Sequence, residues 1–157
     1  MVVRSYRPDD FAEVVAMWRA SRRAAFSYVA VHLTYTLEDD QRYFREVIAV
    51  RYTVWLAELD GRIVAFMALR GDVLEQLFVA VDRQRQRIGT RLLAMAKQLS
   101  PGGLRLFTFQ RNDGARRFYE RHGFRAVRLG VSPAPESEPD VEYCWVPEGA
   151  QRAGEPP

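Results

Sequence analysis

The sequence has few of the residues that hold proteins together through covalent bridges or metal ions. Its single cysteine, Cys144, excludes an internal disulfide and any cysteine-rich metal site. Its two histidines, His32 and His122, lie far apart in the chain, so we expect no zinc site. Lysine is also scarce, because Lys97 is the only lysine among 23 basic residues and the rest are arginines. We therefore expect a protein without a metal ion.

Long hydrophobic runs are missing as well. No run approaches the roughly 20 apolar residues of a membrane span, and the first ten residues contain no apolar signal-peptide core. We expect a cytoplasmic protein that does not contact membranes. The formal net charge of +3 is mild for 157 residues and does not by itself indicate nucleic-acid binding. Hydrophobic content of 48% and charged content of 27% are typical of one soluble globular domain.

The spacing of apolar residues predicts alternating helices and strands. Strands are expected at 2–6, 52–59, 63–69, 73–79, 104–109, 124–129 and 142–146, and helices at 8–23, 36–50, 88–99 and 112–122. Asp60-Gly61 between two strands predicts a type I′ hairpin. This order predicts one α/β domain over residues 1–146, with a mixed sheet and helices on both faces, followed by a disordered tail at 147–157. A homodimer could form if the terminal strands leave a pairable edge.

The stretch from Leu74 to Leu93 has the pattern of a phosphate-binding device. A short apolar strand leads into a loop rich in arginine and glutamine, and Gly89 then opens an amphipathic helix. The first N–H groups of a helix lack internal partners and carry partial positive charge, so anions bind there. The loop arginines could add guanidinium contacts or could form an ordinary solvated surface. A third interpretation, a nucleic-acid binder, is disfavoured because the net charge is modest and the aromatic residues are not grouped around the basic loop.

A second stretch, from Asn112 to Phe124, resembles a motif of the GNAT acyltransferase superfamily. The family pattern N-x-x-A-x-x-F-Y-x-x-x-G-F matches residues 112–124, and the loop pattern Q/R-x-x-G-x-G/A falls on residues 84–89. Arg87 stands where the family usually has its first glycine. The resemblance implies a single-domain, mixed and mostly antiparallel sheet, and acetyl-CoA as the co-substrate.

The resemblance also implies how acetyl-CoA would bind. The strand ending at Val79 and the strand 104–109 would splay apart, and the pantetheine arm would insert between them as an extra strand. The implied cofactor contacts are Leu77, Phe78, Val79, Gln84, Arg85, Gln86, Arg87, Ile88, Gly89, Thr90, Asn112 and Tyr119. Arg87 would either point outward and add a cation or weaken binding. Asn112 would hydrogen-bond the pantetheine, cap its own helix, or do both.

Two catalytic residues follow from the resemblance and from acid–base chemistry. Tyr119 would protonate the departing thiolate, since a phenol of pKa ~10 can donate to it when well oriented; its alternative role is packing on the sheet. Glu75 is the candidate base, because a carboxylate on a central, covered strand is costly unless it is paired or functional. It could instead be a solvated or salt-bridged glutamate. Asp72 is a second choice.

The acceptor is expected to be a primary amine of unknown identity. Aromatic residues that could line its pocket, or simply fill the core, are Phe26, Tyr28, His32 and Tyr35. Acidic residues that would suit a cationic amine are Glu136, Glu138 and Asp140, although acidic loops are also common on surfaces. The sequence thus predicts an N-acetyltransferase that transfers acetyl directly in a ternary complex. The main alternative is a non-catalytic acyl-CoA-binding sensor or scaffold on the same fold.

Overall fold

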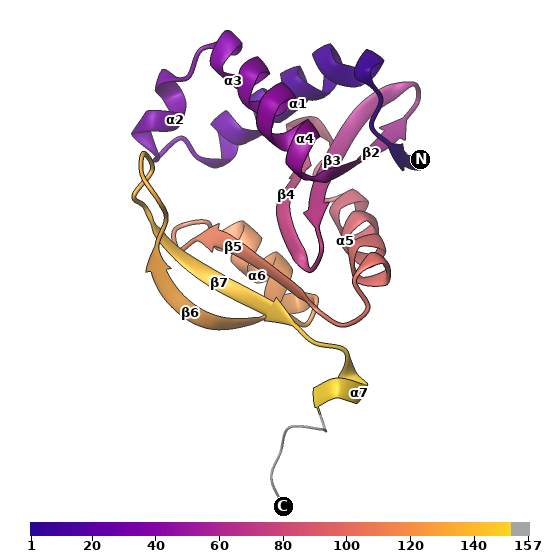
Figure 1. Ribbon diagram of the computed structural model, residues 1–157, viewed down its shortest axis with the longest axis vertical. Coiled ribbons are helices and arrows are strands. Elements are labelled where there is room, and N and C mark those ends of the chain that lie inside the picture. The colour runs from indigo at the N-terminus through magenta and orange to yellow at the C-terminus, as the bar shows by residue number, and fades with distance from the viewer. Residues whose placement is uncertain (152–157) are drawn as a thin grey trace, which may run out of the picture.

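The computed structural model describes residues 1–151 and shows one sheet flanked by helices (Figure 1). The strands are β1 Val2–Ser5, β2 Thr53–Leu59, β3 Arg62–Arg70, β4 Val73–Val79, β5 Leu104–Phe109, β6 Arg125–Val131 and β7 Pro139–Trp145. The helices are α1 Phe11–Ala25, α2 Ala30–Thr34, α3 Leu37–Tyr43, α4 Ala49–Arg51, α5 Ile88–Leu99, α6 Asp113–Arg121 and α7 Glu148–Gln151. Short 3-10 turns cover Pro8–Asp10 and Val81–Arg83, and a π-helical turn, Phe44–Ile48, joins α3 to α4.

The seven strands form a single sheet in the order β1-β2-β3-β4-β5-β7-β6. Every neighbouring pair is antiparallel except β4 and β5, which run parallel. This confirms the expected mixed, mostly antiparallel sheet in one α/β domain. The parallel pair lies at the middle of the sheet, and it divides the molecule into an upper and a lower half in Figure 1.

Two hydrophobic cores lie on opposite faces of the central strands. On one face Val14, Val15 and Trp18 of α1 pack with Phe44 and Ile48 against β2 and β3. On the other face α5 and α6 pack against β3, β4, β5 and β7. Because β3 is covered on both faces, its residues from 63 to 69 are all buried. This explains why β3 reads as a nearly continuous apolar run.

Local sequence signals for turns and caps correspond to the observed geometry. Asp60 and Gly61 both have positive φ, at 52° and 72°, as a type I′ hairpin turn requires. The Thr36 hydroxyl accepts from the Asp39 N–H while the Asp39 carboxylate accepts from the Thr36 N–H, which is the expected capping box. Gly123 follows the last turn of α6 with φ of 85°, as a C-terminal glycine should.

The structure departs from the sequence-based expectations in its irregular segments. The segment without clear periodicity contains the short helix α2, and the helix expected at 36–50 is interrupted by the π-helical turn. The loop expected at 130–140 is shorter, because β6 extends to Val131 and β7 begins at Pro139. Helix α7 falls within the segment 147–157 expected to be a tail, and residues 152–157 lie outside the described residues.

Candidate active site

The central feature of the molecule is a cleft that opens where β4 and β5 diverge. The two strands are registered at one pair only, Val73 with Arg105, and the Arg105 N–H also donates to the Asp72 carbonyl at 2.7 Å. Beyond this point the strands separate, as the resemblance implied. A cleft of about 2040 Å³ lies against their divergent ends. Half of the backbone groups of a strand face each neighbour, so those of β4 that face the cleft have no ladder partner from β5.

The cleft brings together nearly all of the residues expected at the cofactor and catalytic sites. The residues that line it are Glu75, Leu77, Phe78, Val79, Gln84, Arg85, Arg87, Ile88, Gly89, Thr90, Asn112 and Tyr119. Gln86 is exposed in the same loop but does not line the cleft. The Val79 carbonyl is partly engaged already, because it accepts from the Ser21 hydroxyl at 3.2 Å and from Gln84 Nε2 at 3.4 Å.

One wall of the cleft is the N-terminus of α5. The Arg91 N–H donates to the Arg87 carbonyl at 3.1 Å and closes the first turn, which leaves the N–H groups of residues 88–90 at the end of the helix without intrahelical acceptors. The preceding residue, Arg87, makes no side-chain cap. Arg85 and Arg87 are exposed, so their guanidinium groups are open to solvent. An uncapped helix end beside free guanidinium groups is suited to a phosphate.

Arg87 has the backbone conformation that explains why a glycine is usual at its position in the loop pattern. Its φ of 62° and ψ of 14° place it in the left-handed region, which costs a residue with a Cβ roughly 1–2 kcal/mol. Arg85 has the same φ. The loop that precedes α5 therefore contains two arginines whose backbone has a left-handed conformation. Their exposure fits the expectation that the Arg87 side chain points outward.

Gly89 and Asn112 lie where α5 and α6 meet beside the cleft. A Cβ at Gly89 would lie 3.4 Å from the Phe118 ring and 3.6 Å from a Val79 methyl, so the space at this position holds a methyl group in ordinary contact and little more. Asn112 caps α6, since its Oδ1 accepts from the Ala115 N–H at 3.2 Å. The capping role proposed for Asn112 is therefore present, and its amide still lines the cleft.

Tyr119 projects from α6 into the junction between the core and the cleft. It is 8% exposed and packs against Phe118, Phe124 and Tyr143, with ring centroids 5.2–6.3 Å apart. Burial raises its pKa well above the ordinary value for a phenol. The hydroxyl therefore stays protonated at neutral pH, which a proton donor requires. The same shift makes the phenol a weaker acid, so donation to a thiolate would depend on close orientation of the two groups.

Glu75 differs from the expectation of a buried carboxylate. It is exposed, and it lies beyond the one residue pair that joins β4 to β5. The register of β3 and β4 shifts between Ala68 and Leu69, which pair with Gln76 and Leu74, so Glu75 is an extra, bulged residue. The bulge turns its side chain out of the regular alternation and into the cleft. Its negative charge raises the pKa of Tyr52, after the larger effect of burial.

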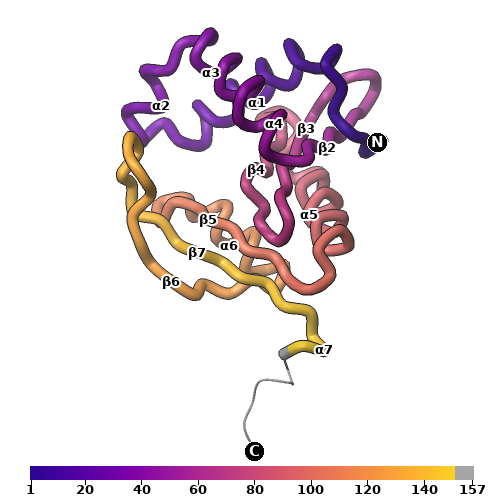
Figure 2. The backbone as a smooth tube through the Cα atoms, in the orientation of Figure 1, coloured from indigo at the N-terminus to yellow at the C-terminus, as the bar shows by residue number. Residues whose placement is uncertain are grey.

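The far end of the cleft is bridged by two segments from opposite halves of the molecule. The loop between β6 and β7 reaches α2, as the backbone trace shows (Figure 2), and His32 Nε2 lies 3.2 Å from Glu136 Oε1. Burial lowers the pKa of His32, and its hydrogen bond to Glu136 partly opposes this shift. Arg111 forms a second bridge, since it pairs with Glu138 and lies over the Tyr28 ring at 4.4 Å.

The aromatic residues considered for the acceptor pocket form one cluster at this bridge. Phe26 contacts the rings of Tyr28, His32, Phe78 and Phe109 at 5.0–6.4 Å. Phe26, His32 and Tyr35 also line the cleft, as do Glu136 and Asp140, whereas Tyr28 and Glu138 do not. Most of these residues therefore do both: they fill the space between the two halves of the molecule, and they line the cleft.

Sequence reasoning missed Arg22, Tyr43 and Tyr52. Arg22 and Tyr43 line the cleft, and Tyr52 lies close to Glu75. One signal for Arg22 was present: it follows Trp18 by four residues, so it lies on the apolar face of α1, where an arginine is out of place. The tyrosines carried no signal, because their position depends on how α3 and the π-helical turn pack on β2.

Comparisons with known proteins agree with this geometry. Residues 50–126 match the family model described as acetyltransferase (GNAT) domain. The peptidyl-lysine N-acetyltransferase YiaC of Escherichia coli is 35% identical over 127 residues, which are 80% of this chain and 84% of YiaC. The chain belongs to the GNAT acetyltransferase family.

Solved structures show the same fold. The solution structure of apo-form YjaB from Escherichia coli superposes with a TM-score of 0.73 at 24% identity, covering 93% of this chain and 99% of that one. The PaiA N-acetyltransferase of Thermoplasma acidophilum, solved in complex with coenzyme A, gives a TM-score of 0.66 at 15% identity, covering 94% and 100%. The protein is thus a GNAT-type acyltransferase, an N-acetyltransferase whose acceptor the family does not specify.

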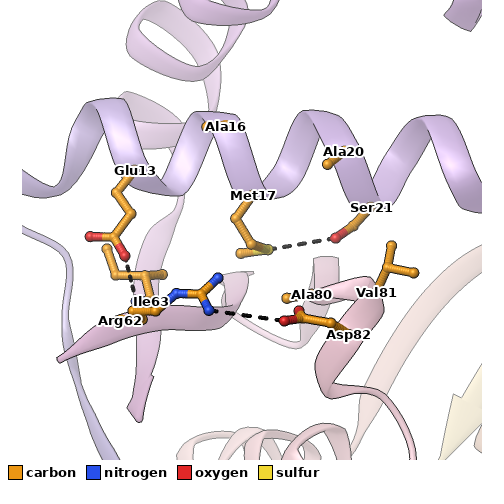
Figure 3. A pocket seen from close by; sticks show the side chains of 10 residues that line it. All are labelled: Glu13, Ala16, Met17, Ala20, Ser21, Arg62, Ile63, Ala80, Val81 and Asp82. Atoms are coloured by element: carbon orange, nitrogen blue, oxygen red, sulfur yellow. Dashed lines mark hydrogen bonds and ion pairs between the residues drawn. The ribbon is translucent and has the colours of Figure 1, made fainter. Parts of the chain in front are cut away.

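A second hollow of this GNAT enzyme, about 460 Å³, lies between α1 and the ends of β3 and β4 (Figure 3). Its polar groups are already engaged: Glu13 accepts from the Ile63 N–H at 2.8 Å, and Arg62 pairs with Asp82 at 3.9 Å. The hollow therefore has the character of a structural groove.

Within residues 1–151 no group of three His, Cys, Asp or Glu side chains is placed to hold a metal ion. In the same part of the chain, no helix is both long and apolar enough to cross a membrane.

Proposed function

We propose that this N-acetyltransferase uses acetyl-CoA as donor and transfers the acetyl group directly to a primary amine in a ternary complex. The observation that carries the proposal is the cleft between β4 and β5, which has an uncapped helix N-terminus at one end and an aromatic, acidic wall at the other. The coenzyme A present in the PaiA structure supports the choice of donor.

The two ends of the cleft suit the two ends of acetyl-CoA. The pyrophosphate would accept hydrogen bonds from the N–H groups of residues 88–90, with Arg85 and Arg87 beside it. The pantetheine arm would then run along the unpaired edge of β4, where Leu77 and Val79 offer backbone groups. This arrangement puts the thioester near Glu75 and Tyr119, which both line the cleft.

The proposed chemistry needs one base and one acid. Glu75, acting through a water molecule, would take the proton of the ammonium group, because only the neutral amine can attack a thioester. The amine nitrogen would form a bond to the acetyl carbon, and the carbon–sulfur bond would break. The Tyr119 hydroxyl would give its proton to the departing thiolate, and the second proton that the nitrogen loses on becoming an amide would pass through water to the Tyr119 oxygen and restore the phenol. A backbone N–H of β4 near the divergence would stabilise the negative charge on the carbonyl oxygen.

The first acceptor to test is the side chain of a lysine. The name of YiaC, a peptidyl-lysine N-acetyltransferase, supports this choice. The acidic side chains that line the far end of the cleft, Glu136 and Asp140, also suit a cationic amine. The expected cytoplasmic location and homodimer stay predictions.

The test is an assay of CoA thiol release with a panel of amines and lysine peptides. Tyr119→Phe should lower kcat by about 10²-fold or more, the usual contribution of a general acid, with little change in the affinity for acetyl-CoA. Tyr28→Phe is the control, because it removes another buried phenol hydroxyl, one that does not line the cleft. Acetyl-CoA binding without turnover of any amine would favour the acyl-CoA-binding sensor or scaffold instead.

A further inference from the structure

A buried arginine occupies the acceptor end of the cleft. Arg22 lies near the end of α1, is only 7% exposed, and lines the cleft together with His32, Tyr35 and Glu136. Its guanidinium lies over the Trp18 ring at 4.5 Å and near the Tyr35 ring at 5.5 Å. Two aromatic rings thus fix the plane of the charged group. A fixed guanidinium loses little entropy when it binds a planar anion.

The hydrogen-bond donors of Arg22 are only partly used. Nη2 donates to Asp40 Oδ1 at 2.5 Å. Nε is buried and has no acceptor among the described residues, and the indole N–H of the adjacent Trp18 is in the same state. A buried donor without a partner is costly, and native proteins rarely leave one without a reason.

The charge of Arg22 is also incompletely compensated. Asp40 is the only carboxylate that contacts it in the described chain, and Asp40 is shared with Arg19, which forms a second ion pair to its other oxygen. Other carboxylates that line the cleft have partners of their own: Glu136 is hydrogen-bonded to His32, and Asp39 to Thr36. The neutral form of His32, favoured by burial, adds no charge. One carboxylate therefore serves two guanidinium groups.

We propose that Arg22 is a specificity-determining residue that binds a carboxylate of the acceptor. The proposal rests on the proposed function, since it assigns the class of amine that the enzyme acetylates: a primary amine that carries a carboxylate nearby. A guanidinium matches a carboxylate through paired N–H donors, and these bonds are strong where water is largely excluded. The carboxylate can belong to a free amino acid, to the C-terminus of a peptide, or to an acidic neighbour of a lysine.

Arg19 supplies a matched control within the same cluster. It pairs with the same Asp40 and also donates to the Tyr35 carbonyl at 3.0 Å, so it ties α1 to α3 as Arg22 does. Unlike Arg22, it does not line the cleft. If Arg22 were only a structural tie, Arg19→Gln and Arg22→Gln would have the same effect on acceptor choice.

The experiment compares probes that differ in one carboxylate. The first pair is Nα-acetyl-lysine and Nα-acetyl-lysinamide, and the second is an amidated lysine peptide with glutamate or glutamine next to the lysine. Binding to the CoA-loaded protein is monitored through the side-chain Nε–H signal of Arg22 in NMR spectra, and turnover is measured as kcat/KM. Binding requires no chemistry, so it tests the carboxylate site separately from the reaction. The two pairs distinguish a main-chain carboxylate from a side-chain one.

We expect the carboxylate member of at least one pair to bind about tenfold more tightly and to shift the Arg22 Nε–H signal, a preference typical of one charge-assisted contact. Arg22→Gln should reduce the ratio to near one and Arg22→Lys should restore part of it, whereas Arg19→Gln should keep most of it, because the Arg22 guanidinium stays in place. If Arg22→Gln does not fold, the wild-type NMR titration and the Arg22→Lys variant still test whether Arg22 binds the carboxylate.

Equal binding of both members of each pair would overturn the assignment, as would an equal loss of preference in Arg19→Gln. Failure of all four probes to bind at millimolar concentration would overturn it too. Carboxylate-dependent binding without turnover would contradict the proposed function and leave the carboxylate site standing.

Discussion

Replacing Arg87 with glycine separates two effects that this residue has on the protein. Its left-handed backbone costs roughly 1–2 kcal/mol in the folded state, and glycine removes that cost but adds about 0.5–1 kcal/mol of unfolded-state entropy. The net gain is about 0.5–1 kcal/mol in the free energy of unfolding. For a chain of this size, that raises Tm by about 1–4 °C.

The same substitution removes a guanidinium from the expected pyrophosphate site. Because Arg87 is exposed, its contact with a phosphate is screened by solvent and contributes about 1 kcal/mol, or a fivefold change in Kd. We therefore expect Arg87→Gly to be more stable than the wild type and to bind acetyl-CoA about fivefold more weakly.

Arg87→Gln is the control, because it removes the charge but keeps a Cβ in the left-handed conformation. It should weaken acetyl-CoA binding as Arg87→Gly does, without the rise in Tm. Differential scanning calorimetry and isothermal titration calorimetry measure the two quantities on the same samples. Tighter binding of acetyl-CoA by Arg87→Gly than by the wild type would refute this reasoning and identify Arg87 as an obstruction at the glycine position.

Three further changes test other parts of the site. Glu75→Gln should remove the acidic limb of the pH–rate profile, whereas Asp72→Asn should not; an unchanged profile in Glu75→Gln would place the base elsewhere. Gly89→Val should lower the free energy of unfolding by about 1–3 kcal/mol, because its Cβ would lie 3.4 Å from the Phe118 ring and its methyl groups would collide with that ring. Gly89→Ala should be tolerated. If urea unfolding found Gly89→Val as stable as the wild type, α5 and α6 would not be tightly packed. The pKa of His32 is lowered in the folded protein, so below about pH 6.5 the unfolded chain binds a proton that the folded chain does not. The free energy of unfolding therefore decreases as the pH falls towards the folded pKa. His32→Gln should flatten this part of the curve of Tm against pH, and an unchanged slope would contradict the cause assigned.

The regular elements could be predicted because their signals are local. The Asp60-Gly61 turn and the Thr36 capping box depend on residues within four positions of one another, and both have the expected geometry. The motif at 112–124 likewise led to the helix that carries Tyr119. These signals do not depend on how distant parts of the chain pack.

The exposure of Glu75 could not be predicted from its strand alone. Its surroundings depend on the bulge against β3 and on how far β5 turns away, and both are properties of the assembled sheet. The bridge from His32 to Glu136 joins residues 104 positions apart, so no local pattern reveals it. Arg22 gave a local signal, an arginine on an apolar helix face, but its place in the cleft appears only once α1, α2 and α3 are assembled.

The most direct test of the central claim is a calorimetric titration of the wild-type protein with acetyl-CoA, with free CoA and ATP as comparison ligands. If the cleft between β4 and β5 holds acetyl-CoA, one molecule should bind per chain in the micromolar range, and ATP should bind weakly or not at all. Absence of binding at millimolar acetyl-CoA would contradict the claim, since a loop that cannot hold the pyrophosphate cannot present the thioester to Tyr119.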